Sequence, residues 1–426
     1  MGEEKTYDFI RDLLTEATRP FRSRRVHIGM DEAYNLGRGP YLTRNGLVPV
    51  AEIMQQHLTR VLAITRELGL EPMMWSDMFF HGYGYRKKEP LPQSVYDCCP
   101  EGVQLVYWDY DARPEEDFSY FINRHRPFGE PIFAGGIWTW LGFGAHWDFT
   151  FRHTERALNA CKKEGIREVF VTIWGDNGTE CLYTANILGL ALWAEHGYAE
   201  KIDYDKLRAR FEFVTGAKYD DFLALEGIDG VPGAPEGSSS CNPSKYLMWQ
   251  DILTGLLDKN IDGLPLDAHY AALAEKLDPM RTRNGAYNSL FEFSWHAARV
   301  LALKSEMGLR ITRAYKAGDR ETLRRIAEED LPELKSRMKA LQECHRAIWF
   351  RLYKALGWDI MDMRYGSLLS RIDSAAVEIG QYLSGELDRI EELEEKRLDY
   401  NGKPGLPNWL NWFGRVVSAS RIAPYC

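Results

Sequence analysis

The chain has 426 residues, of which 45% are hydrophobic and 27% charged, which is the profile of a globular protein with a large core and room for two or three domains. The 53 basic residues are outnumbered by 62 acidic ones, giving a formal net charge of −9. This balance excludes a general nucleic-acid binder, which needs a basic surface, and gives no reason to expect an anionic membrane as a partner.

Cysteine use and the amino terminus both indicate a reduced, cytoplasmic protein. The seven cysteines are odd in number and form no CxxC pair, so neither a disulfide scaffold nor a zinc ribbon is predicted. The first residues, MGEEKTYDFIRDLL, lack the basic and apolar regions of a secretion signal. No uncharged apolar run approaches the roughly 20 residues that span a bilayer.

The first half of the chain alternates short apolar runs with amphipathic stretches. Helices are expected over 6–21, 50–69 and 154–166. Gly165 is expected to end the third of them. The expected strands are 24–30, 71–75, 103–110, 131–138 and 168–174. Alternating strands and helices predict βαβ units in a parallel sheet. Polar and aromatic residues gather at the carboxyl ends of the strands, where a (β/α)8 barrel carries its active site.

The second half is predicted to be mostly helical. Apolar residues recur at helical spacing over 245–258, 270–277, 290–315 and 375–400. The Gly-, Pro- and Ser-rich segment 226–243 is the best linker. We therefore predict an α/β fold, with a partial TIM barrel of about five βα units over 1–235 and an all-α domain over 236–426. The charge-dense run 386–397 is expected to be a solvated helix face.

The densest chemistry is the string His27-Ile28-Gly29-Met30-Asp31-Glu32 at the end of the first strand. Side chains on a strand alternate faces, so two adjacent carboxylates reach one pocket only where the chain turns. Neighbouring carboxylates also repel, so one of them is expected to keep its proton, which suits a general acid. An Asp-Glu pair alone is typical of an ordinary solvated strand end. The full H-x-G-x-D-E string instead favours a functional site.

The H-x-G-x-D-E string resembles the signature of glycoside hydrolase family 20, the β-N-acetylhexosaminidases. VHIGMDEAYNLGRGPYL is especially similar to the intracellular, hexosaminidase D-like branch with a helical C-terminal domain. Further segments are similar to that branch and occur in the same order: WSDMFF (75–80), YWDY (107–110), FAGGIWTWLGF (133–143), TIWGDNGTE (172–180) and NPSKYLMWQDILTGLLD (242–258).

The resemblance implies substrate-assisted retaining hydrolysis of a terminal β-linked GlcNAc or GalNAc. Glu32 is then the acid and base. Asp31 holds the N–H of the 2-acetamido group, whose carbonyl oxygen attacks C1 to give an oxazolinium ion. The implied partner is an oligosaccharide or glycoconjugate, with no nucleic acid and no membrane.

The resemblance also implies the substrate-binding residues. Trp75, Trp138 and Trp174 are expected to surround the acetamido methyl group and the sugar ring. Tyr110 is expected to orient the acetamido carbonyl, with Tyr107 as its rival. The remaining expected residues are Asp77 and Asp176, which either bind sugar hydroxyls or cap the next helices, and His27, a support beneath the acid pair. Family members commonly have Glu where this chain has Asp176.

Neither a metal nor another cofactor is predicted. The ten histidines show no HExxH or other paired spacing. No GxGxxG follows a strand, so a dinucleotide site lacks support.

The resemblance implies three more barrel strands before residue 24, which this sequence does not contain. We expect either a fragment of a longer chain or a short protein that closes its sheet as a homodimer, and weak or no hydrolysis by the chain as printed. Two other functions stay open. One is a two-carboxylate retaining glycosidase with Asp176 or Asp109 as nucleophile, and the other is an inactive sugar-binding protein.

Overall fold

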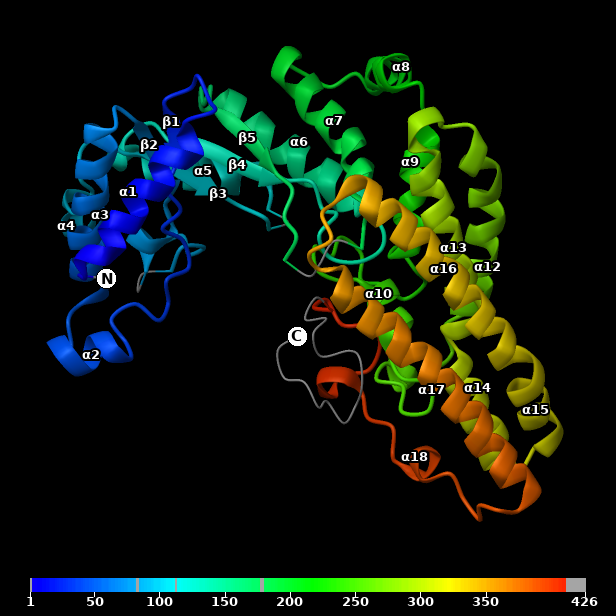
Figure 1. Cartoon of the computed structure of the whole chain (residues 1–426). Helices are drawn as coiled ribbons and strands as arrows, with labels where there is room; N and C mark the ends of the chain where they lie inside the picture. Colours follow the sequence, from blue (N-terminus) through cyan, green and yellow to red (C-terminus); the bar gives the residue numbers. More distant parts are fainter. Residues whose placement is uncertain (1, 82–83, 112, 177–179, 411–426) are drawn as a thin grey trace. The chain divides into compact units, whose positions relative to one another are not determined.

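The computed structural model describes residues 2–81, 84–111, 113–176 and 180–410, and the chain forms two compact units (Figure 1). The first unit consists of Met1–Gly136 with His153–Thr172, and the second of Ile137–Arg152 with Ile173–Cys426. The boundary expected between residues 235 and 236 stays a prediction.

The first unit is built on a sheet of five parallel strands in the order β1-β2-β3-β4-β5. A doubly wound sheet reverses its strand order at a switch point, whereas a barrel adds each strand beside the previous one. The sequential order therefore confirms the predicted partial TIM barrel. The strands are β1 (Arg25–His27), β2 (Glu71–Trp75), β3 (Gln104–Trp108), β4 (Ile132–Gly136) and β5 (Val169–Thr172).

Side chains from the first and last strands meet, which requires the sheet to curl. In a flat sheet β1 and β5 would lie four spacings apart, about 19 Å at about 4.8 Å per strand. Instead, the Arg25 guanidinium lies 2.6 Å from the Glu168 carboxylate, and the rings of His27 and Phe170 have centroids 6.5 Å apart. The inner face of the sheet is therefore concave, as in a barrel wall.

Helices follow the strands of the first unit, as the sequence predicts. Helix α3 buries one face, including Leu58, Val61 and Leu62, and packs against β2 and α1. Each such apolar side chain contributes about 1.5–3 kcal/mol when fully buried. Gly165, with φ 75°, follows the end of α6. The helices are α1 (Glu4–Thr18), α2 (Pro40–Asn45), α3 (Val50–Glu67), α4 (Gln93–Asp97), α5 (Glu115–His125) and α6 (Trp147–Lys163), with 3-10 turns η1 (Asp77–Phe80) and η2 (Arg126–Phe128).

The second unit is helical, and α13 packs against both α12 and α16, while α16 packs on α17 (Figure 1). Its α-helices are α7 (Ile187–Tyr198), α8 (Tyr204–Thr215), α9 (Tyr219–Ala224), α10 (Pro243–Trp249), α11 (Asp258–Ile261), α12 (Leu266–Leu277), α13 (Asn288–Lys304), α14 (Met307–Lys316), α15 (Arg320–Arg325), α16 (Leu331–Leu352), α17 (Trp358–Ser384) and α18 (Glu391–Glu394). Shorter turns are η3 (Tyr183–Asn186), η4 (Leu225–Ile228), η5 (Asp278–Thr282), η6 (Gly285–Tyr287), the π-helical η7 (Ile326–Asp330) and η8 (Tyr400–Gly402).

Two helical predictions in this unit are wrong at their carboxyl ends. The helix expected over 375–400 stops at Ser384, because Gly385 adopts φ 87°. Within the run 386–397 only α18 is helical, and Ile390 and Leu393 are buried, so this run is not a solvated helix face. The helix expected over 245–258 ends at Trp249, after which the Asp251 carboxylate accepts backbone N–H groups from Leu253 and Thr254.

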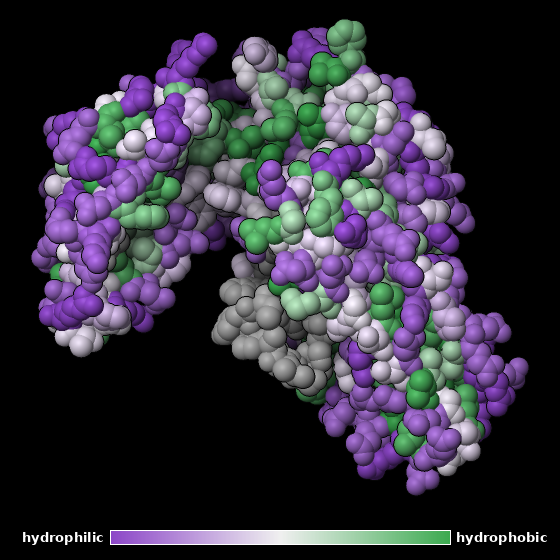
Figure 2. Space-filling model, viewed as in Figure 1, coloured by the Kyte–Doolittle hydropathy of each residue, from purple (hydrophilic) through white to green (hydrophobic). Residues whose placement is uncertain are grey.

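Hydrophilic residues predominate on the face drawn in Figure 2, in both units. Among the helices that the structure describes, none combines the length and apolarity needed to cross a bilayer.

Candidate active site

The chain turns sharply after β1, and this turn carries the two acidic residues of the sequence motif. Among the described residues other than glycine, only Met30 (φ 78°), Glu32 (φ 47°) and Asn401 have positive φ. Such conformations cost about 1–3 kcal/mol each and tend to cluster at functional sites. Asp31 and Glu32 are both exposed at the carboxyl end of β1. The chain therefore turns at Gly29, Met30 and Glu32, so the turn includes the acid pair.

Hydrogen bonds from three sides hold the turn. The Gly29 N–H donates to Nδ1 of His27 (3.1 Å), and the Trp75 N–H donates to the Gly29 carbonyl (3.1 Å). The Glu32 N–H donates to Oδ2 of Asp77 (2.8 Å). The strained backbone is thus fixed by β2 and by the residues that follow it.

Asp77 uses both of its carboxylate oxygens on protein donors. Besides the Glu32 N–H on Oδ2, the indole Nε1–H of Trp108 donates to Oδ1 (3.2 Å). The side chain is only 7% exposed. Burial raises the pKa of Asp77, while its hydrogen bonds from Glu32 and Trp108 lower it. Asp77 is the first residue of η1 rather than the residue that caps it.

An aromatic layer lies on the inner face of the sheet next to the turn. The His27 and Trp75 rings have centroids 4.4 Å apart, and Trp75 is 5.8 Å from Phe170. Burial lowers the pKa of His27, and the Asp31 carboxylate partly raises it. Because Nδ1 accepts the Gly29 N–H, the neutral ring carries its proton on Nε2. His27 therefore lies against Trp75 and the turn, and its role as a support beneath the acid pair stays a prediction.

Glu32 also receives a hydrogen bond that the sequence reasoning missed. The hydroxyl of Tyr34 donates to Oε1 of Glu32 (3.1 Å). Partial burial, followed by the Glu32 charge, raises the pKa of Tyr34 to about 12. The only sequence signal for this contact was the closeness of Tyr34 to the acid pair.

The two tyrosines of the YWDY segment (107–110) lie in different surroundings. Tyr107 is 1% exposed, packs its ring against His125 of α5 (4.8 Å) and donates its hydroxyl to Asp109 (2.7 Å). Tyr110 instead stacks on Trp108 (5.5 Å), and its hydroxyl is 3.0 Å from Oγ1 of Thr172. Of the two tyrosines, Tyr110 is the one that lies beside the Trp108 indole bound to Asp77. Trp108 itself was not predicted.

Asp109 is the centre of a buried ion pair. It is 3% exposed, and Oδ2 accepts from Tyr107 and from Nε of Arg113 (both 2.7 Å), while Oδ1 accepts the Asp111 N–H (2.9 Å). Burial raises the pKa of Asp109, and the Arg113 guanidinium opposes that change. Such an engaged carboxylate is poorly placed to attack a sugar.

The other three predicted residues belong to the second unit. Trp138 is 1% exposed and packs on Trp140 (5.0 Å) and Phe149 (4.4 Å). Trp174 is half-buried and Asp176 is exposed. Their roles stay predictions.

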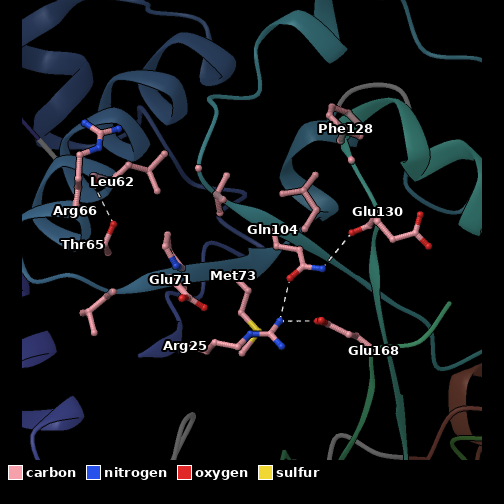
Figure 3. Close-up of a pocket in the computed structure, with 16 residues that line it drawn as sticks. Arg25, Leu62, Thr65, Arg66, Glu71, Met73, Gln104, Phe128, Glu130 and Glu168 are labelled. Atoms are coloured by element: carbon pink, nitrogen blue, oxygen red, sulfur yellow. Dashed lines mark hydrogen bonds and ion pairs between the residues drawn. The ribbon is translucent and has the colours of Figure 1, made fainter. Parts of the chain in front are cut away.

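A separate pocket of about 720 Å³ opens at the amino ends of the strands, opposite the acidic turn (Figure 3). The Arg25 side chain there donates to Gln104 (2.9 Å) and to Glu168 (2.6 Å), and the Gln104 amide donates to the Glu130 carbonyl (3.2 Å). These polar side chains bind one another across alternate strands, as the layers inside a barrel do. The pocket contains none of the predicted site residues.

No three His, Cys, Asp or Glu side chains in the described part of the chain are grouped as metal ligands. A reaction without a metal stays a prediction.

Comparisons with known proteins match both ends of the chain. A family model described as the catalytic domain of glycosyl hydrolase family 20 matches residues 1–116, and one described as the glycoside hydrolase 20C C-terminal domain matches residues 220–409. A search of the curated proteins found no match. A solved structure of an enzyme described as targeting pectin rhamnogalacturonan II, from glycoside hydrolase family 138, is similar at 9% identity, covering 90% of this chain and 79% of that one. Its TM-score of 0.35 is too low to support an argument.

Proposed function

Because the chain belongs to glycoside hydrolase family 20, we propose that it is an exo-acting β-N-acetylhexosaminidase. Its substrate is an oligosaccharide or glycoconjugate that ends in β-linked GlcNAc or GalNAc. The observation that carries the proposal is the strained turn that leaves Asp31 and Glu32 exposed side by side at the carboxyl end of β1. In a barrel, this end of the strands bears the active site.

The proposed reaction is substrate-assisted. The 2-acetamido carbonyl oxygen forms a bond to C1 while the bond from C1 to the leaving oxygen breaks, and the Glu32 carboxyl group gives that oxygen a proton. Asp31 accepts the acetamido N–H and balances the positive charge of the oxazolinium ion. The Glu32 carboxylate then takes a proton from water, whose oxygen attacks C1 and restores the acetamido group. Two inversions at C1 give net retention.

The engaged state of Asp109 supports substrate assistance over Asp109 as an enzyme nucleophile. Both of its carboxylate oxygens accept hydrogen bonds from protein groups, and an acetamido oxygen supplied by the substrate does not need that carboxylate. Trp75 and Tyr110 are proposed to contact the acetamido group, and the family resemblance adds Trp138, Trp174 and Asp176.

Glu32→Gln tests the role of the acid. We expect kcat/KM for an unactivated β-N-acetylglucosaminide to fall about 10²–10⁴-fold, because general acid catalysis is typically worth that factor. A substrate with a good aryl leaving group should lose less, since its oxygen needs less protonation. The measurement is a ratio to the unaltered chain, so it needs only a turnover that can be measured. The matched control is Glu101→Gln, at an exposed glutamate before β3, and equal turnover in Glu32→Gln would remove Glu32 from the mechanism.

A second measurement separates the two hydrolytic mechanisms. A thiazoline that mimics the oxazolinium ion should inhibit the enzyme, and the substrate with a 2-hydroxyl in place of the acetamido group should not turn over. A covalent sugar–protein adduct on Asp176 or Asp109, trapped and seen by mass spectrometry, would establish the two-carboxylate mechanism instead.

A further inference from the structure

The contacts of Asp77 differ from those of a residue that binds sugar. A carboxylate that binds a sugar hydroxyl needs an accessible oxygen, whereas Asp77 is 7% exposed. Its Oδ2 accepts the Glu32 N–H at 2.8 Å, and its Oδ1 accepts the Trp108 indole N–H at 3.2 Å. One carboxylate thus joins the turn after β1 to the end of β3.

On the turn, Asp77 binds the backbone N–H of Glu32, and the Glu32 backbone is strained. Glu32 has φ 47°, a region that non-glycine residues occupy at a cost and keep only when their surroundings impose it. A charged acceptor makes roughly twice as strong a hydrogen bond as a neutral one. The Asp77 carboxylate is therefore suited to keep Glu32 in this conformation.

We propose that Asp77 is a positioning residue, which fixes the Glu32 main chain and the Trp108 indole in one arrangement and does not itself bind the sugar. The proposal rests on the proposed function, in which Glu32 is the acid. It departs from the expectation, drawn from the sequence, that Asp77 contacts sugar hydroxyls.

Asp77→Asn is the informative substitution. The asparagine side chain keeps one acceptor oxygen and replaces the other by an NH2 group, which cannot accept. Either the Glu32 N–H or the Trp108 indole then loses its partner. A displacement of about 1 Å at a reacting group costs about 10²-fold, so we expect kcat to fall by up to about 10²-fold with KM changed less than about 3-fold. A sugar-binding role predicts the reverse, a raised KM.

The control is Asp229→Asn in the second unit. Asp229 is also buried and accepts two backbone N–H groups, from Gly144 (2.9 Å) and Ser244 (3.0 Å). This control also removes a buried carboxylate that holds main-chain N–H groups, but it does not touch the turn, so the folded fraction should keep both kcat and KM.

A measurement without turnover keeps this inference separate from the proposed function. With 15N-labelled protein, the Trp108 indole N–H signal should shift and exchange faster in Asp77→Asn than in the unaltered chain. An unchanged indole signal, or a raised KM at constant kcat, overturns the positioning role. If the indole responds while no sugar substrate is hydrolysed, the proposed function fails and the contact between Asp77, Trp108 and the turn stands.

Discussion

Two side chains hold Glu32 at different points. Tyr34 donates to its carboxylate at 3.1 Å, and Asp77 accepts its backbone N–H at 2.8 Å. The first contact restrains the direction of the carboxylate, and the second restrains the main chain that carries it. The placement of the Glu32 carboxyl group therefore depends on both contacts.

Tyr34→Phe tests the contact at the carboxylate. We expect kcat/KM to fall by about 2- to 10-fold, which corresponds to the roughly 0.5–1.5 kcal/mol of one hydrogen bond. The pKa of Tyr34 is about 12, so the phenol stays a donor throughout an ordinary assay range. Tyr198→Phe, at a tyrosine 89% exposed, is the control. An unchanged kcat/KM would contradict the role given to Tyr34.

The features that the sequence predicts are those that depend on neighbouring residues in the chain. Strand alternation requires a turn before two adjacent acids can share a pocket, and Gly29, Met30 and Glu32 form that turn. The partners of the turn follow no local rule. The contact from Asp77 to Glu32 spans 45 residues and the contact from Trp108 to Asp77 spans 31, so they depend on strand register. For the same reason strand alternation alone does not choose between Tyr107 and Tyr110.

At the scale of elements, the βα order was predictable and the element ends were not. Apolar periodicity located all five strands, since each buried strand is a short apolar run between turn signals. The strands end two or three residues early at β1, β3, β4 and β5, where the chain leaves the sheet into loops. The prediction of a helix over 375–400 is wrong beyond Ser384, because Gly385 is left-handed and ends the helix although apolar residues recur after it.

Glycine substitutions test how far backbone conformation controls these elements. In Gly29→Ala the new Cβ has room, since its nearest neighbour is Oδ1 of Asp31 at 3.9 Å, but φ is 75°. A left-handed alanine costs about 1–2 kcal/mol, so we expect the free energy of unfolding to fall by about 1 kcal/mol once the lower entropy of the unfolded chain is allowed for.

The matched control is Gly366→Ala. Gly366 lies inside α17 with open space around its Cβ position, and alanine in a helix is favoured by about 0.5–1 kcal/mol over glycine. Thermal unfolding should therefore show opposite signs for the same added methyl group. Stabilisation by Gly29→Ala would mean that the turn is not held in its left-handed conformation.

At the scale of the whole molecule, the two family models match parts of the chain that differ in architecture, one with parallel strands and one helical. The catalytic-domain model covers β1 to β3, and the C-terminal-domain model covers α9 to η8. Between these matched regions the chain runs through Trp138, Trp174 and Asp176, whose roles only the resemblance supports. The helical unit was predictable as helical from its periodicity, but its buried charges were not, because their partners are far apart in the sequence.

Three of these buried charges form a triad in the second unit. Glu180, 1% exposed, lies 3.0 Å from Nζ of Lys245, 0% exposed, and 3.0 Å from Nη1 of Arg364. Burial lowers the pKa of Lys245, while the Glu180 carboxylate raises it. The Glu180 carboxylate thus pairs with both cations, so substitutions at Glu180 and at Arg364 are not equivalent.

Glu180→Gln removes the carboxylate charge that both buried cations contact, and we expect the free energy of unfolding to fall by about 3–5 kcal/mol. Arg364→Met leaves the balanced pair of Glu180 and Lys245, so it should cost clearly less. Asp373→Asn breaks an exposed ion pair with Lys335 and should change stability by less than about 1 kcal/mol. Urea unfolding of the three variants measures this order. If Arg364→Met costs as much as Glu180→Gln, then the guanidinium is held mainly by packing, and charge balance does not explain why these residues are buried together.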